Sequence, residues 1–541
     1  MSTVGWDEVL RVALLGAERA ALPTVDATSD PRSLETLLAA VSADRTPENA
    51  LLSAAGLLWQ ARRAGRPVPR RSTTAQPRIA PAESQPMLSR KASTMVARLA
   101  RYSPMLFASW LEAVAARGCV AHFGVLTQLL DLGARNDALC AAIVRVLGHR
   151  GRWLALQNPE WSWAAPPRDE DVDAETIWRV GRREQRTAVL SRLRGVDPGR
   201  ARALLESTWS KEGAEARIAF LEEMDINLND DDEPFLEQAL DTRHSSEREA
   251  VAELLARLPR SRLVTRMAHR LEALLAVGVD SSSRLPAHLK AKEALLVTLP
   301  ATCDEAMTRD GMEVGTSNAQ TGVGERAGLL LQMLSVVPPS HHVRRFGCSP
   351  RGLVDLAAGS EHARLLLNGL RSAAVLHGDA EMAGALVDAA VDAGYLSGTL
   401  TVFPLLEESV LSLLPPQRRA ALAREALRPP LRDGHPALSL LNACTFPWDD
   451  ALAKDFVRAV RASMRVSVGE SDRVRSTLEK AVRWLPASCI EFAQMGWPLT
   501  DRVPAYTWTY SYNKFLDSLR LREEAWAALD DVVPPVPPPS A

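Results

Sequence analysis

Residues 251–274 read VAELLARLPRSRLVTRMAHRLEAL and carry the clearest helical pattern in the chain. Their apolar side chains recur at offsets of three, four and seven residues, on one face of an α-helix: Val251, Leu254, Leu255 and Leu258. Comparable stripes fill the stretch from Arg186 to Leu275, beginning at Val189, at Ile218 and at Val251, so they recur after 29 and 33 residues. Each stripe is narrow and must be buried against a neighbouring helix. A period of about 20 to 50 residues is typical of a helical solenoid.

The composition is compatible with a large hydrophobic core, but it does not indicate a class of binding partner. The chain has 541 residues, of which 46% are hydrophobic, so burial of a sizeable core is expected. This length suggests several globular domains, although a solenoid can continue this far as one body. Lys plus Arg number 64 and Asp plus Glu 66, a formal net charge of −2. Net charge therefore gives no global argument for nucleic acid or for an anionic membrane, and only local patches remain open.

Targeting and redox features favour the cytoplasm. The six cysteines are scattered without metal-ligand spacing, which fits a reducing compartment better than a disulfide framework. The first residues, MSTVGWDEVLRVALLG, include Asp7 and Glu8 and lack a basic start, so we interpret them as an amphipathic helix and not as a signal peptide. No run approaches about 18 apolar residues, so no membrane span is expected.

The predicted fold class is all-α: an irregular HEAT-like helical-repeat solenoid with an N-terminal helical domain. Residues 285–300 are expected to be helical within it. The Pro/Arg/Ser-rich linker, residues 65–86, is either a solvated connection or a basic tether for an acidic partner. The Pro-rich tail, residues 531–541, is either a frayed end or a proline-rich ligand. The expected segments are N-terminal helices in 1–64, a Pro/Arg/Ser-rich linker in 65–86, a helical domain in 87–174, HEAT-like repeats in 175–490, an aromatic-rich segment with a last helix in 491–530, and a Pro-rich tail in 531–541.

The most distinctive local text is GHRGRWLALQNPEWSW, residues 148–163. The Asn158-Pro159 pair predicts a turn, because proline disfavours a helical residue before it. Exposed arginine and tryptophan side chains are typical of interface hot spots, whereas buried ones would close the junction between the N-terminal helices and the repeats. If the segment is exposed, its partner-binding candidates are Arg150, Arg152, Trp153, Asn158 and Trp161.

A second aromatic group lies near the C-terminus. Tyr506, Trp508, Tyr510 and Tyr512 alternate with small hydroxyl residues, which is the period of a strand or an extended segment. We take Tyr506, Trp508 and Tyr510 as further candidates for partner binding.

Most motifs that carry chemistry are absent from the sequence. It contains no P-loop, no H-E-x-x-H and no G-x-S-x-G, and its histidines are dispersed, so no catalytic residue, cofactor or metal site is predicted. The nearest approach is an EF-hand-like run from Asp225 to Glu233. Asp230 stands where that loop requires glycine and Leu236 where it requires glutamate. Capping of the following helix by Asp231 or Asp232 explains these acids better.

One basic face favours an alternative function. Arg262, Arg266 and Arg270 are spaced by four residues, so they share one face of a helix. Such a face suits phosphate contacts, and nucleic-acid binding is therefore one alternative. A solvated helix face explains the same pattern.

The text of residues 148–163, followed by short helix pairs, resembles a bacterial family of uncharacterised helical-repeat proteins. The resemblance is carried by Arg150, Gly151, Arg152, Trp153, Leu154, Asn158, Pro159 and Trp161. Members of that family are encoded beside SWIM zinc-finger proteins, MoxR-type AAA+ ATPases and von Willebrand A domain proteins. The resemblance implies a part in an ATPase-driven assembly, with an AAA+ ATPase and a von Willebrand A protein as partners, and it supplies no catalytic residues.

These observations together favour a non-enzymatic scaffold or adaptor that presents a helical surface to protein partners. Nucleic-acid binding is the first alternative. An enzyme whose site is assembled from distant residues is the second, because such a site is invisible in one sequence.

Overall fold

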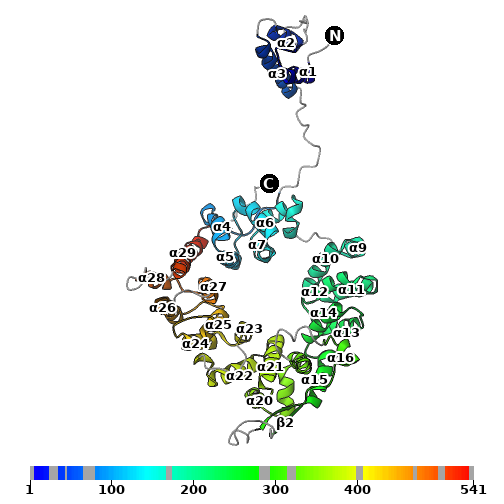
Figure 1. The fold of residues 1–541 in the computed structure, drawn as a ribbon, viewed down its shortest axis with the longest axis vertical. Helices are drawn as coiled ribbons and strands as arrows, with labels where there is room; N and C mark the ends of the chain where they lie inside the picture. The colour runs from blue at the N-terminus through cyan, green and yellow to red at the C-terminus, as the bar shows by residue number, and fades with distance from the viewer. Residues whose placement is uncertain are drawn as a thin grey trace. The chain divides into compact units, whose positions relative to one another are not determined.

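The described part of this computed structural model is almost entirely helical, and the predicted all-α class is confirmed (Figure 1). The chain divides into two compact units, residues 1–79 and 80–541. Residues 65–79 of the expected linker and 535–541 of the expected tail lie outside the described residues. The structure describes residues 5–22, 34–42, 46–64, 80–165, 174–279, 293–313, 324–397, 406–466, 472–497 and 506–534.

The described part of the first unit contains α1 (Trp6–Leu15), α2 (Leu34–Ser42) and α3 (Pro47–Ala64). The N-terminal helices predicted within residues 1–64 are therefore present. Their small shared core is formed by Val9, Leu38, Ala54 and Leu58.

The first helices of the second unit begin at residues that are typical of helix starts. The Ser89 side chain accepts a hydrogen bond from the Ala92 amide at 2.9 Å and caps α4, and Pro104 stands in the first turn of α5. Residues 80–86, expected in the linker, belong to this unit, because the amide of Val120 donates to the carbonyl of Pro86 at 2.9 Å. The helices are α4 (Arg90–Tyr102), α5 (Pro104–Ala116), α6 (Leu126–Arg135), α7 (Cys140–Val144), α8 (Gly148–Ala155) and the 3-10 helix η3 (Pro159–Ala164).

Residues 186–275, which carry the helical stripes, form consecutive helices. Every second helix packs on the next, so α10 contacts α12 and α12 contacts α14. Their buried positions Val189, Phe220 and Val251 lie 31 residues apart. The stripe that the sequence predicts to begin at Ile218 begins at Phe220 in the structure, because Ile218 is only half-buried while Phe220 is fully buried. The elements are α9 (Ala174–Val180), α10 (Arg183–Val196), α11 (Pro198–Thr208), α12 (Ala214–Met224), α13 (Glu233–Ala239), α14 (Ser245–Ala256), α15 (Arg262–Leu274) and α16 (Glu305–Arg309).

Arginine–tryptophan stacking fixes consecutive helices of this stretch. The Arg186 guanidinium lies 4.4 Å from the ring centre of Trp178, and that of Arg217 lies 4.9 Å from the ring centre of Trp209. Each arginine also pairs with a glutamate, Arg186 with Glu212 and Arg217 with a carboxylate on α14 at 3.1 Å. Stacking of this kind uses the flat guanidinium together with its charge.

The predicted helix over residues 285–300 is wrong at residues 293–300, the part of this range that the structure describes. Strands β2 (Leu275–Val279) and β3 (Glu293–Val297) form an antiparallel pair with Leu275 opposite Val297. A short apolar run such as EALLV fits a helix and a strand equally well, and only its pairing partner decides between them. A second small pair joins β1 (Met87–Leu88) to β4 (Val532–Val533).

Helices in the remaining part contact helices two or three elements further along the chain. The contacting pairs include α18 with α21, α21 with α23, α23 with α25, α25 with α27 and α27 with α29, and α29 contacts α4 and α5 (Figure 1). The bounds are α18 (Glu325–Val336), α19 (Pro339–Phe346), α20 (Pro350–Ala358), α21 (Ala363–His377), α22 (Ala380–Asp392), α23 (Glu408–Ser412), α24 (Pro416–Ala426), α25 (Pro436–Ala443), α26 (Asp450–Val466), α27 (Asp472–Ala481), α28 (Cys489–Gln494) and α29 (Tyr506–Ala527).

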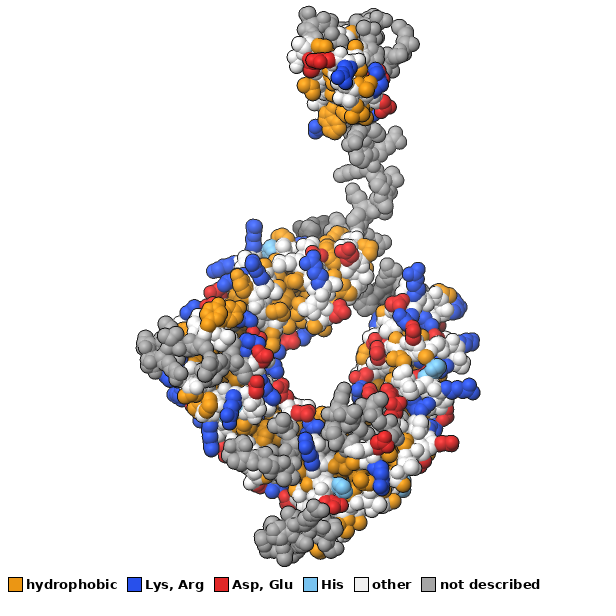
Figure 2. Space-filling model, viewed as in Figure 1, with side chains coloured by type: hydrophobic (Ala, Val, Ile, Leu, Met, Phe, Trp, Pro, Cys, Tyr) orange, Lys and Arg blue, Asp and Glu red, His pale blue; other side chains and the backbone are white. Residues whose placement is uncertain are grey.

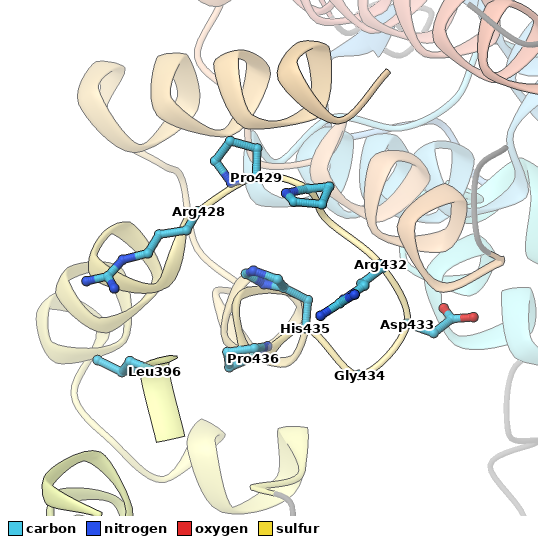
Figure 3. A pocket seen from close by; sticks show the side chains of 9 residues that line it. Leu396, Arg428, Pro429, Arg432, Asp433, Gly434, His435 and Pro436 are labelled. Atoms are coloured by element: carbon cyan, nitrogen blue, oxygen red, sulfur yellow. The ribbon is translucent and has the colours of Figure 1, made fainter. Parts of the chain in front are cut away.

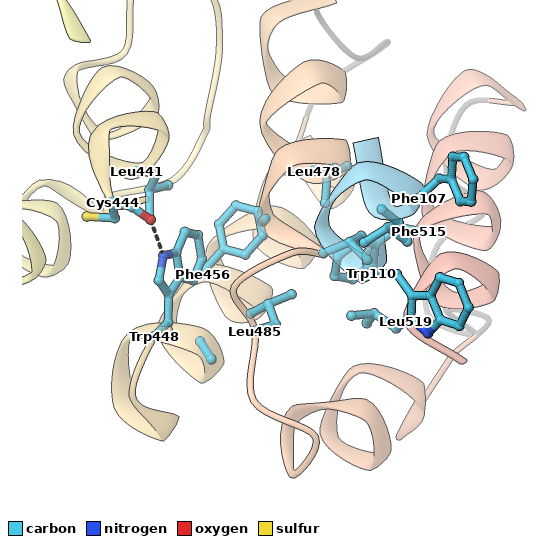
Figure 4. Close-up of a cluster of buried hydrophobic side chains, with 14 of the residues drawn as sticks. Phe107, Trp110, Leu441, Cys444, Trp448, Phe456, Leu478, Leu485, Phe515 and Leu519 are labelled. Atoms are coloured by element: carbon cyan, nitrogen blue, oxygen red, sulfur yellow. Dashed lines mark hydrogen bonds between the residues drawn. The ribbon is translucent and has the colours of Figure 1, made fainter. Parts of the chain in front are cut away.

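Two large cores hold the second unit together. One collects residues from Ala174 to Ala389, and the other joins residues 88–164 to residues 387–529. The second core therefore buries the last helix against the first helices of the unit (Figure 4). Trp110 on α5 donates from Nε1 to the carbonyl of Ala525 on α29 at 2.9 Å, which satisfies the one polar atom of a fully buried indole.

Candidate interaction surfaces

Two of the tryptophans in residues 148–163 pack against the core. Trp161 Nε1 donates to Asp131 Oδ1 at 2.9 Å, and Trp163 lies so close to Gly133 that a Cβ there would stand 2.1 Å from its ring. Asn158 accepts a hydrogen bond from the Glu160 amide at 3.1 Å and caps η3, so the turn predicted at Asn158-Pro159 is present. Trp161 and Asn158 are thus engaged within the fold.

The other candidates of this segment lie on α8. Glu83 accepts hydrogen bonds from the backbone amides of His149 and Arg150 at 3.1 and 2.7 Å, a carboxylate at the positive end of a helix. The Arg150 guanidinium lies 5.7 Å from the ring centre of Phe123, whose side chain is 53% exposed. Arg152 and Trp153 are half-buried. The exposed aromatic group here is therefore Phe123, which the sequence did not single out.

The extended segment predicted at residues 506–512 is wrong, because these residues form the first two turns of α29. Trp508 and Tyr512 are fully buried, four residues apart on one helical face, and Phe515 and Leu519 continue that face. Tyr506 and Tyr510 lie on the other side, 82% and 59% exposed. Trp508 is thus a core residue, and the two tyrosines remain available to a partner.

An open groove of about 660 Å³ lies between α4 and α29. Its aromatic lining residues are Tyr510 and Tyr102, the latter 64% exposed at the end of α4. The Arg98 guanidinium and the Glu524 carboxylate pair across it at 2.6 Å, so charges of both signs are present. Tyr102 was missed because it lies 404 residues from Tyr506 and only the packing of α29 on α4 joins them.

The predicted basic face on α15 is neutralised within the fold. Arg262 binds Glu233 through two hydrogen bonds of 2.9 and 3.1 Å, and hydrogen bonds from this guanidinium lower the pKa of the Glu233 carboxyl. Arg266 and Arg270 both reach Asp310 at 2.6 Å, and Asp310 is only 3% exposed. The three arginines do share a helical face, but their charges are matched by acids and are poorly placed for phosphates.

A fully buried ion pair between Arg194 and Asp232 was not predicted from the sequence. Arg194 on α10 donates to both carboxylate oxygens of Asp232 at 2.9 and 2.8 Å and to the carbonyls of Ile226 and Met224. Neither side chain is exposed. The prediction that Asp231 or Asp232 caps the following helix is confirmed only in part. Asn229 caps the 3-10 turn before α13, and the Asp232 carboxylate accepts a hydrogen bond from the Asn229 amide at 3.1 Å in the same capping box while it also neutralises Arg194. The side chain of Asp232 makes no cap on α13 itself.

A surface hollow of about 390 Å³ lies beside the loop between α24 and α25, and its lining side chains are shown in Figure 3. Arg432 points toward His435, whereas Asp433 points outward. Burial lowers the pKa of His435, and its Nδ1 accepts a hydrogen bond from the Ala437 amide at 3.3 Å, which caps α25. The imidazole therefore serves the helix start.

Groups with nucleophilic or metal-binding chemistry are dispersed or shielded. Within the described ranges, no three His, Cys, Asp or Glu side chains are placed to hold a metal ion. Burial raises the pKa of the Cys444 thiol to about 12 and that of Cys489 to about 11, so both stay protonated and unreactive. None of the helices in the described ranges is both long and apolar enough to cross a bilayer.

Comparison with models of protein families finds a match over most of the chain. A family model described as a family of unknown function (DUF5691) matches residues 8–529. No curated protein and no solved structure matches the chain.

Proposed function

The chain belongs to this family of unknown function, and on that premise we propose that it is a non-enzymatic protein-interaction scaffold. The observation that carries the proposal is the groove between α4 and α29, which is lined by the exposed tyrosines Tyr102 and Tyr510, together with the exposed Tyr506 one helical turn before Tyr510. Tyrosine is enriched in interface hot spots because its ring offers a large contact area at a low cost in side-chain entropy. The opposite face of α29 is locked into the core, so these side chains are held on a rigid support.

The proposed scaffold is an irregular HEAT-like solenoid over residues 175–490. Its support is the 31-residue spacing of equivalent positions on α10, α12 and α14. This spacing relates Arg186 to Arg217 and to Arg248, and it also relates the buried side chains Leu193, Met224 and Leu255. Stacked helices of this kind provide long binding surfaces because each repeat contacts only its neighbours.

The proposed partners follow from the resemblance in sequence: a MoxR-type AAA+ ATPase and a von Willebrand A domain protein. The test is affinity purification of the full chain from its native host, with and without nuclease, read by mass spectrometry. We expect one of these two partners to be recovered in both conditions. We also expect Tyr506→Ala/Tyr510→Ala to lose it, because truncation removes the exposed rings and leaves the buried face of α29 intact.

A matched control is Val196→Ala, which truncates a side chain 83% exposed at the end of α10. It should retain the partner, and both variants should melt as the wild type does. Equal recovery by the tyrosine variant and the wild type would refute the role of the groove. Recovery that disappears with nuclease would refute the protein scaffold in favour of nucleic-acid binding.

A further inference from the structure

A shallow groove of about 620 Å³ runs between α10 and α12. Its floor is made of small or apolar side chains: Ala188, Ser191, Ile218 and Ala219. The small floor residues let another backbone approach closely. Ile218 is half-buried here because it faces the groove and not the core. The glutamates that line the groove are Glu184, Glu215, Glu222 and Glu223.

A second, separate groove of about 410 Å³ lies beside α14, where α15 and α18 complete its walls. Its floor is more apolar and includes Ala252, Met312 and Leu331. Glu249 and Glu253 stand on its α14 side. Both grooves thus combine an apolar floor with a glutamate rim.

The glutamates recur from helix to helix. Glu215 lies 31 residues after Glu184, and Glu253 lies 31 residues after Glu222, so equivalent positions on packed helices carry the same charge. We call Glu184, Glu215, Glu222, Glu223, Glu249 and Glu253 the acidic face. Figure 2 shows red side chains gathering over α10, α12 and α14.

Little positive charge balances the acidic face. Arg183, the one arginine among the lining residues of the first groove, lies 3.4 Å from Glu184 and 3.3 Å from Glu215. Glu222 and Glu253 have no ion-pair partner among the described residues. The pKa of the Glu249 carboxyl is raised, first by burial and then by the charges of Glu313 and Glu253. The acids here repel one another, whereas those facing Arg262, Arg266 and Arg270 are paired.

We propose that the acidic face is the docking site for a basic amphipathic helix of a protein partner, lying across α10, α12 and α14. Packed helices are about 8 to 10 Å apart, so glutamates at equivalent positions repeat at about that distance. Residues seven apart on a helix are separated by about 10.5 Å along its axis. Lysine or arginine at every seventh position therefore matches the glutamate rows, and the adjacent apolar side chains enter the grooves. Nucleic acid is disfavoured, because its phosphates would meet carboxylates.

The test is fluorescence anisotropy of the full chain with a synthetic labelled peptide. The probe is an amphipathic peptide of about 20 residues with lysine at every seventh position beside a leucine stripe. Its matched control carries glutamate in place of lysine. We expect saturable binding of the lysine peptide that weakens between about 50 and about 300 mM NaCl, because salt screens exposed charges. The glutamate peptide should not bind.

Glu222→Lys/Glu253→Lys should weaken binding about tenfold or more, since two attractions become repulsions. The matched control is Glu425→Lys/Glu523→Lys, which makes the same change in net charge at exposed glutamates on α24 and α29 and should bind normally. A second variant, Ala219→Trp, fills the groove floor without changing charge and should also block binding.

Equal weakening by both charge-reversed variants would overturn the proposal, because only net charge would then matter. Normal binding to Ala219→Trp would overturn the groove as the seat of the helix. The tyrosine variant Tyr506→Ala/Tyr510→Ala should bind the peptide normally, so the result is independent of the α4–α29 groove. Tighter binding of a labelled single-stranded DNA than of the lysine peptide would refute the choice of partner class.

Discussion

His342 should make the second unit sensitive to mild acid. It lies on α19 with 1% of its surface exposed, stacked at 6.3 Å on the ring of Phe346 and edge-on to His341 at 5.4 Å. Neither of its ring nitrogens has a hydrogen-bond partner among the described residues. Burial, followed by the charges of His341 and Arg345, lowers the pKa of His342 from about 6.5 to about 3.

The sign of the effect follows from the neutral state of the buried ring. In the unfolded chain His342 is protonated with a pKa of about 6.5, whereas in the folded state its pKa is about 3, so the folded ring stays neutral down to far lower pH. Its contribution to stability is therefore fully present above about pH 6.5 and is lost as pH falls below that value. With about 1.36 kcal/mol per pKa unit, the free energy of unfolding should drop by about 2 kcal/mol between pH 7 and pH 5 from this residue alone.

The perturbation is His342→Leu, a side chain of similar volume that cannot titrate. Urea unfolding of the full chain at pH 7 and pH 5, followed by circular dichroism, gives the loss of stability for each protein. We expect the variant to lose about 2 kcal/mol less than the wild type between these pH values. His244→Leu, at an exposed histidine, should behave as the wild type does. An equal loss in the wild type and His342→Leu would refute the reasoning, since the buried ring would then not be the cause.

Three further substitutions test the packing directly. Asp232→Ala should lower the free energy of unfolding by about 3 to 5 kcal/mol, because it leaves the Arg194 charge buried without its partner; urea denaturation measures this, and a loss below 1 kcal/mol contradicts it. Gly133→Ala should lower the melting temperature and change tryptophan fluorescence by displacing Trp163, whereas Gly384→Ala, with open space around its Cβ, should stabilise by about 1 kcal/mol. A Gly133→Ala protein with unchanged fluorescence would show that the ring has room to move.

The functional interpretation depended on surroundings that the chain order conceals. The arginines on α15 were correctly placed on one face, yet Glu233 and Asp310 come from segments 29 and 44 residues away and cancel their charge. Within its own helix, the pair Glu222-Glu223 is typical of a solvated face. Only the packing of α10, α12 and α14 aligns it with Glu184 and Glu253. Charge on a surface is a property of neighbours in space, and a helical pattern reports neighbours only within one helix.

The same division explains the aromatic segment near the C-terminus. Residues 506–512 alternate aromatic and small side chains over seven positions, and that is too short to separate period 2 from the i, i+4 pair formed by Trp508 and Tyr512. Extending the window to Phe515 and Leu519 would have identified the helix, because all four side chains then share one face.

By itself, the sequence determined the all-α class, the buried face of α14 and the starts of capped helices such as α4 and α5, because amphipathic spacing and capping depend on residues only a few positions apart. Tertiary structure alone decided that β2 and β3 pair, that α29 closes against α4 and α5, and that Arg194 meets Asp232 inside the core. Each of these contacts joins segments separated by a loop or by most of the chain. Their free energy comes from burial and pairing across that separation, which local periodicity does not encode.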